Sequence, residues 1–514
     1  MKHAGRTLLL FLVLVLVSCK KQEIQHPYAD ITYEYYDTLR TAQFAINRQQ
    51  VKWYIDSMRI AAHDTAFIDI FADRYYADES PYIWIDTKGA DKRLETLSAA
   101  LATVDSDAIS RTVVFQPQIE RALKRLRDFN FTRTYSISRC LAEIEYYSTK
   151  GLLRMASGLR FGFINPYKMM NRIDLTDADD TLCTTFRTLY DTPTETTGKE
   201  YLSSIILSAS KGNFMRDISA AKQHNKNYIR LREEFSRHNL SPGKRRALAA
   251  NMERFRWRTG SMEKKHVWVN LPEFMLRAVD STSGETLEMK VCEGSIKHKT
   301  PQLASKIQYL ELNPAWNVPH SIVSREIAPK IADGDEEYFE RNKMKIIEKT
   351  TGEEIEPSAV DAQMLKSGKY SVVQNKGEGN SLGRMIFRFK NNFSIFLHDT
   401  PNRAAFSRSN RTVSHGCIRL EEPLALAAFL LGEKDEFNID KMRIAVDIPP
   451  KTEKGKRLLE NKSHKPAGSR AIKPAVPLYI TYFTAYPDSR GNIVYTADPY
   501  GYDNKIISLL GSYK

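Results

Sequence analysis

Apolar residues recur at intervals of three and four positions along the first half of the chain. This spacing places them on one face of a helix, so it predicts amphipathic helices between about residues 42 and 250. The clearest periodic runs are residues 41–62, 92–104, 118–129 and 136–159. Residue types that carry out catalysis do not form a recognisable pattern in this half of the chain. We therefore interpret residues 42–250 as an all-helical scaffold domain that could also position a substrate.

Apolar and polar residues alternate from His266 onward, which predicts β-strands separated by turns. The expected strands are residues 266–270, 288–292, 307–312, 385–389, 393–397, 479–483 and 492–495. A helix is expected to begin at Pro423, which suits a first helical turn, and to stop at Gly432. The chain is therefore predicted to be α+β, with a mainly β, sandwich-like domain over residues 251–450.

A charged, helix-favouring segment interrupts the strand pattern at residues 331–369. Long insertions over a β core are commonly functional surface loops. We predict an inserted helical lid that gates substrate access, with a plain surface excursion as the alternative. Trp316 lies shortly before this segment, in a loop bracketed by prolines. Its ring is expected either to line a substrate cleft or to be buried in the protein interior as a packing residue.

The end of the chain changes composition twice. Residues 451–477 are basic and poor in apolar residues, which predicts a linker. Residues 478–514 return to an alternating pattern and are expected to form C-terminal strands that pack on the β domain.

The first residues have the pattern of an export signal. A basic start precedes an apolar run, residues 8–17, that is too short to span a bilayer, so residues 1–18 are predicted to be a secretory signal. The run ends in Leu-Val-Ser-Cys, which resembles the lipobox of bacterial lipoproteins; a plain signal with a chance cysteine is the alternative. Lipidated Cys19 would anchor the protein to a membrane facing the periplasm, with residues 19–41 as a tether.

The charge balance is strongly basic. The formal net charge is +14, and removing Lys2 and Arg6 with the signal leaves +12. Excess positive charge favours anionic surfaces such as phospholipid or a cell-wall polymer. Nucleic acid is excluded as a partner because an exported lipoprotein does not meet it. With 42% hydrophobic and 27% charged residues, the composition is that of a folded globular protein.

The five cysteines contain no C-x-x-C pair, so a zinc or redox motif is unsupported. Cys140 and Cys183 could form a disulfide in an oxidising compartment, and two buried free thiols fit the sequence equally well.

The residues with the clearest chemistry lie between positions 398 and 419. His398 follows a strand-like run, His415 lies two residues before Cys417, and Arg419 lies two residues after it. A cysteine attacks as the thiolate, and a free thiol with a pKa of about 8.5 is mostly protonated at neutral pH. Histidine can accept its proton and arginine can stabilise its charge. We therefore predict an activated cysteine nucleophile.

Backbone flexibility supports this prediction. Gly416 lets the backbone approach closely, and the N–H groups around Gly416 and Cys417 could point at a developing oxyanion.

The order of these residues resembles a known signature. A histidine, a spacer of 15 residues over positions 399–413, and then Ser414-His415-Gly416-Cys417-x-Arg419 is similar to the L,D-transpeptidase catalytic domain of the YkuD type. The helical half is similar to the scaffold domain of the larger, YcbB-like transpeptidases. No room is left between Tyr228 and Asn251 for a peptidoglycan-binding module, so wall targeting would depend on the lipid anchor, the scaffold or the active-site cleft.

The resemblance implies a role for each site residue. Cys417 would be the nucleophile and acyl carrier, and His398 the general base and then acid, its ring oriented by a backbone carbonyl such as that of Asp399. The loop Ser414-His415-Gly416 would support the oxyanion. Arg419 would hold a substrate carboxylate or the local loop. Phe396 stands in the substrate-facing position where larger relatives frequently have tyrosine, and relatives of this subgroup often have serine in place of His415.

The implied reaction is peptidoglycan cross-linking. The enzyme would take a tetrapeptide stem as donor and the side-chain amine of another stem as acceptor, and would form a 3→3 cross-link through a cysteine thioester. No metal or organic cofactor is needed, and carbapenems are expected to acylate Cys417 as covalent inhibitors. The alternatives are a cysteine carboxypeptidase or endopeptidase, an enzyme that links a lipoprotein to the wall, and a non-catalytic wall-binding lipoprotein.

Overall fold

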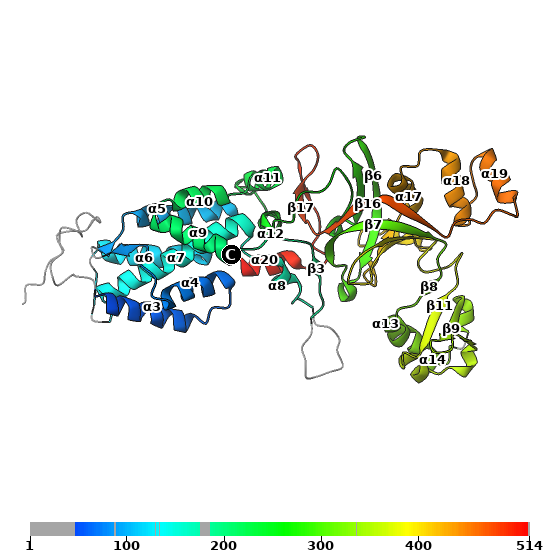
Figure 1. Ribbon diagram of the computed structural model, residues 1–514, viewed down its shortest axis with the longest axis horizontal. Helices are drawn as coiled ribbons and strands as arrows, with labels where there is room; N and C mark the ends of the chain where they lie inside the picture. The colour runs from blue at the N-terminus through cyan, green and yellow to red at the C-terminus, as the bar shows by residue number, and fades with distance from the viewer. Residues whose placement is uncertain are drawn as a thin grey trace, which may run out of the picture. The chain divides into compact units, whose positions relative to one another are not determined.

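The computed structural model describes residues 47–86, 89–128, 130–132, 134–174, 186–335 and 337–511. The chain forms two compact units, a helical unit and a β-rich unit (Figure 1). Of the described residues, the helical unit contains those up to Phe163, with Thr197–Gln223, Leu510 and Gly511. The β-rich unit contains the described residues of Ile164–Thr196 and His224–Leu509. The predicted signal, tether and lipidation site Cys19 lie outside the described residues, as does Cys183.

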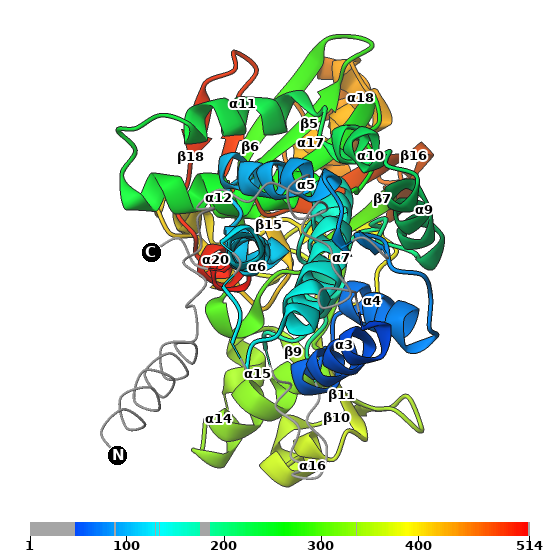
Figure 2. The ribbon, with the colours of Figure 1, turned by 90° about the vertical axis from the view of Figure 1, so that its left-hand side faces the viewer.

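The helical unit is arranged around one long helix, α7, which runs from Ile137 to Phe161 (Figure 2). Its other helices are α3 (Arg48–Ala62), α4 (Phe67–Ala77), α5 (Arg93–Ala102), α6 (Gln116–Arg127), α9 (Lys199–Ser210) and α10 (Phe214–Ala221), with short 3-10 helices η2 (Thr103–Asp107) and η3 (Arg111–Val114) and a hairpin of β1 (Ile85–Asp86) and β2 (Gly89–Ala90). The helices predicted from apolar spacing are confirmed within the described residues.

Buried polar groups of α7 bind the segment before the hairpin. The fully buried carboxylate of Glu145 accepts hydrogen bonds from the backbone N–H groups of Ile83 and Trp84, at 2.7 and 2.8 Å, and from the Tyr76 hydroxyl at 2.7 Å. Burial raises the pKa of Glu145 to about 7, although these donors act in the opposite direction. Cys140, also on α7, is a buried free thiol that donates to the carbonyl oxygen of Ala122.

The division between the units differs from the predicted boundary at residue 250. Helices α11 (Lys226–Phe235) and α12 (Pro242–Arg256) belong to the β-rich unit. They are held there by contacts that are remote in sequence, such as the 2.6 Å ion pair between Arg254 of α12 and Asp503. Helical periodicity predicts that these segments are helices, but it carries no information about which core they join.

The β-rich unit is built on a ten-stranded sheet with the order β12-β13-β15-β6-β5-β4-β16-β7-β3, to which β14 adds beside β6. Its strands are β3 (Tyr190–Asp191), β4 (Lys265–Asn270), β5 (Met275–Asp280), β6 (Glu285–Gly294), β7 (Gln302–Leu312), β12 (Met385–Phe389), β13 (Leu397–His398), β14 (Thr412–Ser414), β15 (Ile418–Leu420) and β16 (Ser469–Thr481). Because β12 also pairs with β7, the sheet closes on itself. The predicted α+β class, with a helical N-terminal region and a mainly β C-terminal region, is confirmed.

Shorter elements complete this unit: α8 (Pro166–Met170), η4 (Leu271–Glu273), η5 (Ile296–His298), η8 (Arg403–Ser407), α17 (Pro423–Leu431), α18 (Glu436–Ala445), α19 (Glu453–Glu460), β17 (Ala485–Pro487), β18 (Ile493–Tyr495) and α20 (Tyr502–Leu509). Helix α17 begins at Pro423 and ends before Gly432, whose φ of 66° is left-handed, as its sequence predicts.

The insertion is larger than predicted and is not purely helical. It contains β8 (Trp316–Asn317), α13 (His320–Ile322), the π-helix η6 (Val323–Ile327), α14 (Ala328–Ala332), α15 (Tyr338–Arg341), β9 (Met344–Glu348), β10 (Glu354–Ile355), η7 (Pro357–Ala359), α16 (Ala362–Lys366) and β11 (Tyr370–Gln374). Four of these segments form a separate sheet with the order β10-β9-β11-β8. Their solvent-facing charged residues hide the strand pattern in the sequence.

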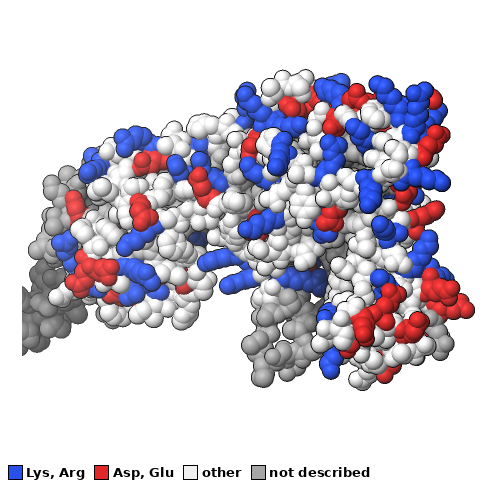
Figure 3. All heavy atoms as spheres, turned by 45° about the vertical axis from the view of Figure 1, so that its right-hand side comes forward, with Lys and Arg blue, Asp and Glu red and all other residues white. Residues whose placement is uncertain are grey.

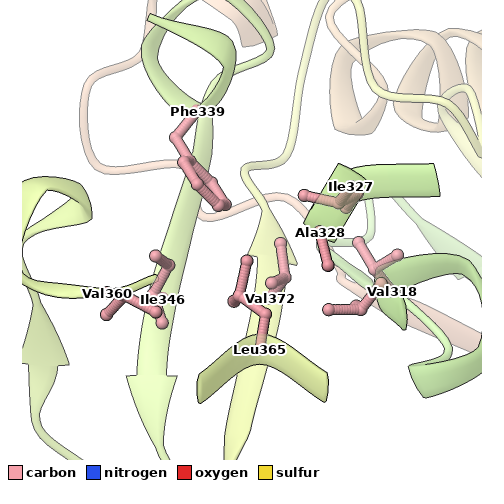
Figure 4. Close-up of a cluster of buried hydrophobic side chains, with 9 residues drawn as sticks. Val318, Ile327, Ala328, Phe339, Ile346, Val360, Leu365 and Val372 are labelled. Carbon is pink, nitrogen blue, oxygen red and sulfur yellow. The ribbon is translucent and has the colours of Figure 1, made fainter. Parts of the chain in front are cut away.

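The insertion has a hydrophobic core of its own (Figure 4). The buried side chains come from its helices and strands alike: Val318, Val323, Ile327, Ala328, Phe339, Ile346, Val360, Leu365 and Val372. The residues in this cluster all belong to the insertion, and this cluster of described residues contains none from the large sheet.

One prediction for the end of the chain is wrong. Residues 451–477 are not a linker, because they form α19 and most of β16, which pairs with β7 through a register shift between Ala471 and Val476. The basic residues there point to solvent while Ile472 and Val476 are buried. The C-terminal strands expected over residues 478–514 are confirmed by the end of β16 and by β17 and β18. The last described element was not predicted: it is the helix α20, in which Tyr502 and Ile506 are buried at helical spacing. Within the described ranges, none of the helices combines the length and apolar character that crossing a membrane requires.

Candidate active site

The predicted cysteine and histidine come from neighbouring parallel strands. In the pairing of β13 with β15, His398 lies opposite Arg419. The same register places Cys417, the residue before β15, opposite Phe396. The Ile418 N–H donates a hydrogen bond to the Phe396 carbonyl oxygen at 3.1 Å. Strand pairing therefore brings together side chains that are 19 positions apart in sequence.

The alternation of the strands decides which side chains share a face. Leu397, Ile418 and Leu420 are fully buried and face the interior of the sheet. Since neighbouring residues on a strand point to opposite faces, Phe396, His398, Cys417 and Arg419 share the other face. This face carries the candidate site.

His398 is buried and neutral. Burial lowers its pKa to about 4, and the nearby positive charge of Arg419 acts in the same direction. Its Nδ1 atom lies 3.3 Å from the carbonyl oxygen of Leu382. A carbonyl oxygen can only accept, so Nδ1 carries the proton and Nε2 is left with a lone pair.

The orienting carbonyl of Leu382 was not anticipated from the sequence. The backbone of Asp399, which was the sequence candidate, also favours the protonated ring. The Asp399 side chain instead shapes the preceding turn, because its Oδ2 atom accepts from the Arg384 N–H at 2.9 Å. Gly383 is required there, since a Cβ atom would lie 2.5 Å from the Asp399 carboxylate.

Cys417 is a protonated thiol in the resting structure. Burial raises its pKa to about 11, while the backbone of Phe396 and the guanidinium groups of Arg388 and Arg419 act in the opposite direction. The site therefore holds a neutral thiol and a neutral imidazole, so proton transfer must accompany attack on a substrate.

The loop before Cys417 is held in one conformation. The Ser414 hydroxyl donates to the Cys417 carbonyl oxygen at 2.6 Å and accepts from the Gly416 N–H at 3.1 Å. Gly416 has a φ of 111°, which an L side chain rarely adopts. The sequence suggested that the N–H groups of Gly416 and Cys417 could both donate to an oxyanion. The Gly416 N–H already donates to Ser414, whereas the Cys417 N–H has no hydrogen-bond partner among the described residues.

A second layer behind the loop was missed by sequence reasoning. The Thr300 hydroxyl donates to the Gly416 carbonyl oxygen at 2.9 Å. Tyr500 donates to the Gly294 carbonyl oxygen at 2.7 Å and accepts from the Thr300 N–H at 3.2 Å. At Gly294, a Cβ atom would lie 1.9 Å from the carbonyl oxygen of His298. No local pattern marks Tyr500, because its partners are about 200 positions earlier in the sequence.

Arg419 lies between two thiols. It is opposite Cys292 in the pairing of β15 with β6, and its positive charge favours the thiolate forms of both Cys292 and Cys417. Its buried Nε atom has no hydrogen-bond partner in the part of the chain that the structure describes. Phe396 lies beside this group: its ring is 4.7 Å from the Arg388 guanidinium and 5.8 Å from the His398 ring.

Two predicted residues lie away from the buried pair. His415 is exposed, and its Nε2 atom is 2.6 Å from Oε1 of Glu326 in the insertion. Trp316 lies on β8 and packs against the hydrophobic core of the insertion, which favours the packing role over contact with substrate. Among the described residues, no group of three or more His, Cys, Asp or Glu side chains could hold a metal ion.

Comparison with known proteins adds the domain type. Residues 264–452 match the model of the L,D-transpeptidase catalytic domain, YkuD. This transpeptidase domain contains every residue of the site built above except Tyr500. Residues 70–235 match the model of a Scaffold domain.

One curated relative is a protein of Haemophilus influenzae (strain ATCC 51907 / DSM 11121 / KW20 / Rd) named "Putative L,D-transpeptidase". It is 31% identical to this chain over 242 residues, which are 47% of this chain and 45% of that protein. The match thus spans a little less than half of either chain.

Proposed function

We propose that the chain is a peptidoglycan L,D-transpeptidase that forms 3→3 cross-links through a thioester on Cys417. The observation that carries the proposal is the register of β13 and β15, which places His398 and Cys417 on one face of the sheet within the transpeptidase domain. An imidazole with a free Nε2 beside a thiol supplies the proton transfers that acyl transfer needs.

The first half of the reaction forms the acyl-enzyme. The sulfur of Cys417 attacks the carbonyl carbon of the third stem residue while its proton passes to Nε2 of His398. The tetrahedral intermediate collapses as the bond to the terminal D-alanine breaks, and His398 returns the proton to the departing amine. The product is a thioester on Cys417 and free D-alanine.

The oxyanion of the intermediate needs a donor that is not already used. The Cys417 N–H fills this role, since the Gly416 N–H is bound to Ser414. The positive charge of Arg419 stabilises the sulfur as it becomes a thiolate. We therefore propose that Arg419 stabilises the Cys417 thiolate rather than binding a substrate carboxylate.

The second half of the reaction transfers the acyl group. The side-chain amine of another stem gives a proton to His398 and attacks the thioester carbonyl, the carbon–sulfur bond breaks, and the thiolate recovers its proton from His398. Water can compete with the amine for the same thioester, and that reaction would release a tripeptide.

We place this reaction at the cell wall. The predicted signal and Cys19 would export the chain and anchor it by lipid on the periplasmic side of a membrane, where stem peptides are available. A carbapenem would acylate Cys417, visible as one adduct in the intact mass that Cys417→Ala removes.

Product analysis tests the function. Purified protein is incubated with a disaccharide-tetrapeptide, and the products are separated and identified by mass spectrometry. Cross-linked dimer and free D-alanine are expected from the unaltered chain and from Cys140→Ala, which removes a thiol of the helical unit. Cys417→Ala should form neither. Tripeptide without any dimer would identify a hydrolase instead.

A further inference from the structure

A carboxylate of the insertion lies against the catalytic motif. The Oε1 atom of Glu326 is 2.6 Å from Nε2 of His415, and both side chains are exposed, with 49% and 42% of their surface accessible. Glu326 lies on the π-helix η6, whose Val323 and Ile327 are buried in the core of the insertion. The insertion therefore presents Glu326 outward, toward the loop that carries Cys417.

Basic side chains from four separate segments lie near this contact. The ring of His298 lies 5.0 Å from that of His415. Burial lowers the pKa of His298; the basic groups of His415, Arg187 and Arg325 lower it further, and Glu326 raises it. His298 thus has three basic neighbours, His415, Arg187 and Arg325, and one acidic neighbour, Glu326.

On the face that Figure 3 shows, the insertion carries several acidic side chains. Its exposed acidic residues include Asp333, Glu337, Glu340, Glu353, Glu354, Glu356 and Asp361. Within the described part of the insertion, Glu326 is the acidic residue that pairs with His415, in the loop before Cys417. We call His298, His415, Arg187 and Arg325 the basic cluster; Glu326 contacts it through His415.

We propose that the basic cluster binds a carboxylate of the stem peptide next to the scissile amide, and that Glu326 occupies this subsite until substrate arrives. The proposal rests on the proposed function, because stem peptides carry several carboxylates. Substrate and Glu326 then compete for the same basic cluster. Binding of the stem carboxylate displaces Glu326 and releases the insertion from the catalytic loop.

Displacement is energetically accessible. An exposed ion pair contributes little to folding stability. The insertion has its own hydrophobic core, so it stays folded when the contact to His415 is lost. A substrate carboxylate makes the same kind of contact with the basic cluster, so the exchange replaces one ion pair by another.

Alkylation of Cys417 tests the subsite without any turnover. The rates of modification by iodoacetate, which is anionic, and iodoacetamide, which is neutral, are measured at Cys417 by peptide mass spectrometry. In Glu326→Gln the ratio of the iodoacetate rate to the iodoacetamide rate should rise about threefold to fivefold, because one competing charge is gone. In His415→Gln the ratio should fall. The control Glu340→Gln, on the same insertion, should leave it unchanged.

A second measurement connects the subsite to the substrate. In the cross-linking assay, Glu326→Gln should lower the KM for the tetrapeptide stem with little change in kcat. Amidation of the stem carboxylate that binds the subsite should remove this advantage. An unchanged alkylation ratio in both Glu326→Gln and His415→Gln overturns the subsite even if cross-links form. A shifted ratio supports it even if the chain makes no cross-link.

Discussion

The Nδ1 atom of His398 lies 3.3 Å from the carbonyl oxygen of Leu382, so a backbone acceptor on the loop before β12 fixes the proton on that side of the ring. The Nε2 lone pair is thereby directed to the face that Cys417 shares. Deep burial keeps the ring uncharged, and it is therefore ready to accept a proton at neutral pH. This relationship supports the role of base that we propose for His398, and it leads to the first prediction.

Replacement of His398 by glutamine should lower kcat/KM for cross-linking by about 10²–10⁴-fold, the usual contribution of a positioned general acid and base. Glutamine keeps a polar side chain in the buried position but cannot accept and return the proton. The loss is measured with the disaccharide-tetrapeptide assay, with near-UV circular dichroism as the check on folding. A loss smaller than tenfold in a folded variant would show that another group takes the proton.

The reactivity of the resting thiol should increase with pH well above neutrality. The pKa of Cys417 is raised to about 11 by burial, so the thiolate fraction grows about tenfold per pH unit below that value. The rate of alkylation by iodoacetamide should therefore rise steadily between pH 6 and pH 10, whereas free cysteine levels off near its ordinary pKa. A plateau at neutral pH would show a thiolate–imidazolium pair and contradict the neutral resting state.

Acid should destabilise the β-rich unit partly through His398. Its pKa falls from 6.5 in the unfolded chain to about 4 in the fold, so between these values the unfolded state binds more protons and stability decreases as pH falls. The difference corresponds to about 3 kcal/mol once pH drops below 4. Urea titrations at pH 7 and pH 4 should show a smaller acid loss for His398→Gln than for the unaltered chain. Equal losses would mean that His398 is not buried as a neutral ring.

Tyr500 should support the catalytic loop through its hydroxyl alone. Tyr500→Phe removes hydrogen bonds to Gly294 and Thr300, so we expect a loss of about 2 kcal/mol in unfolding free energy together with a lower kcat. Tyr502→Phe is the matched control, because the buried Tyr502 hydroxyl has no hydrogen-bond partner among the described residues. Equal effects of the two substitutions on kcat would exclude a specific role for Tyr500.

The insertion should be able to unfold while the large sheet stays folded. Phe339 is 1% exposed within the core of the insertion, and Phe339→Ala should cost this core about 3–5 kcal/mol. Limited proteolysis followed by mass spectrometry should then show new cleavages between residues 316 and 374 while the rest of the β-rich unit resists. Cleavage spread evenly over the unit would show that the two cores unfold together.

The chemistry proposed for the site can be predicted from the sequence, because this chemistry depends on residue types and on their spacing. The order of His398, Ser414, Gly416 and Cys417 predicts an activated thiol before any fold is known. The strand β12 and the helix α17 are predicted with their observed bounds, since a local period and a proline or glycine at the end are enough to define them.

Other elements could not be predicted because their pattern is weak or misleading. The strands of the insertion are short and carry charged residues on their outer face, so β9 reads as part of a helical segment. Residues 451–477 read as a linker because half of β16 faces solvent with lysine and arginine. In both regions, pairing with a distant strand supplies the stability that local sequence does not reveal.

The sequence by itself therefore determined the helical half and the alternating half of this protein, and it supplied the reacting groups that we propose. Only the tertiary structure decided that β13 lies beside β15, that Leu382 orients His398, that Tyr500 stands behind Gly416 and that Glu326 reaches His415. The physical reason is the range of the interactions. Periodicity and turn residues act over a few positions, whereas strand register and buried hydrogen bonds join residues that the chain brings together only when it folds.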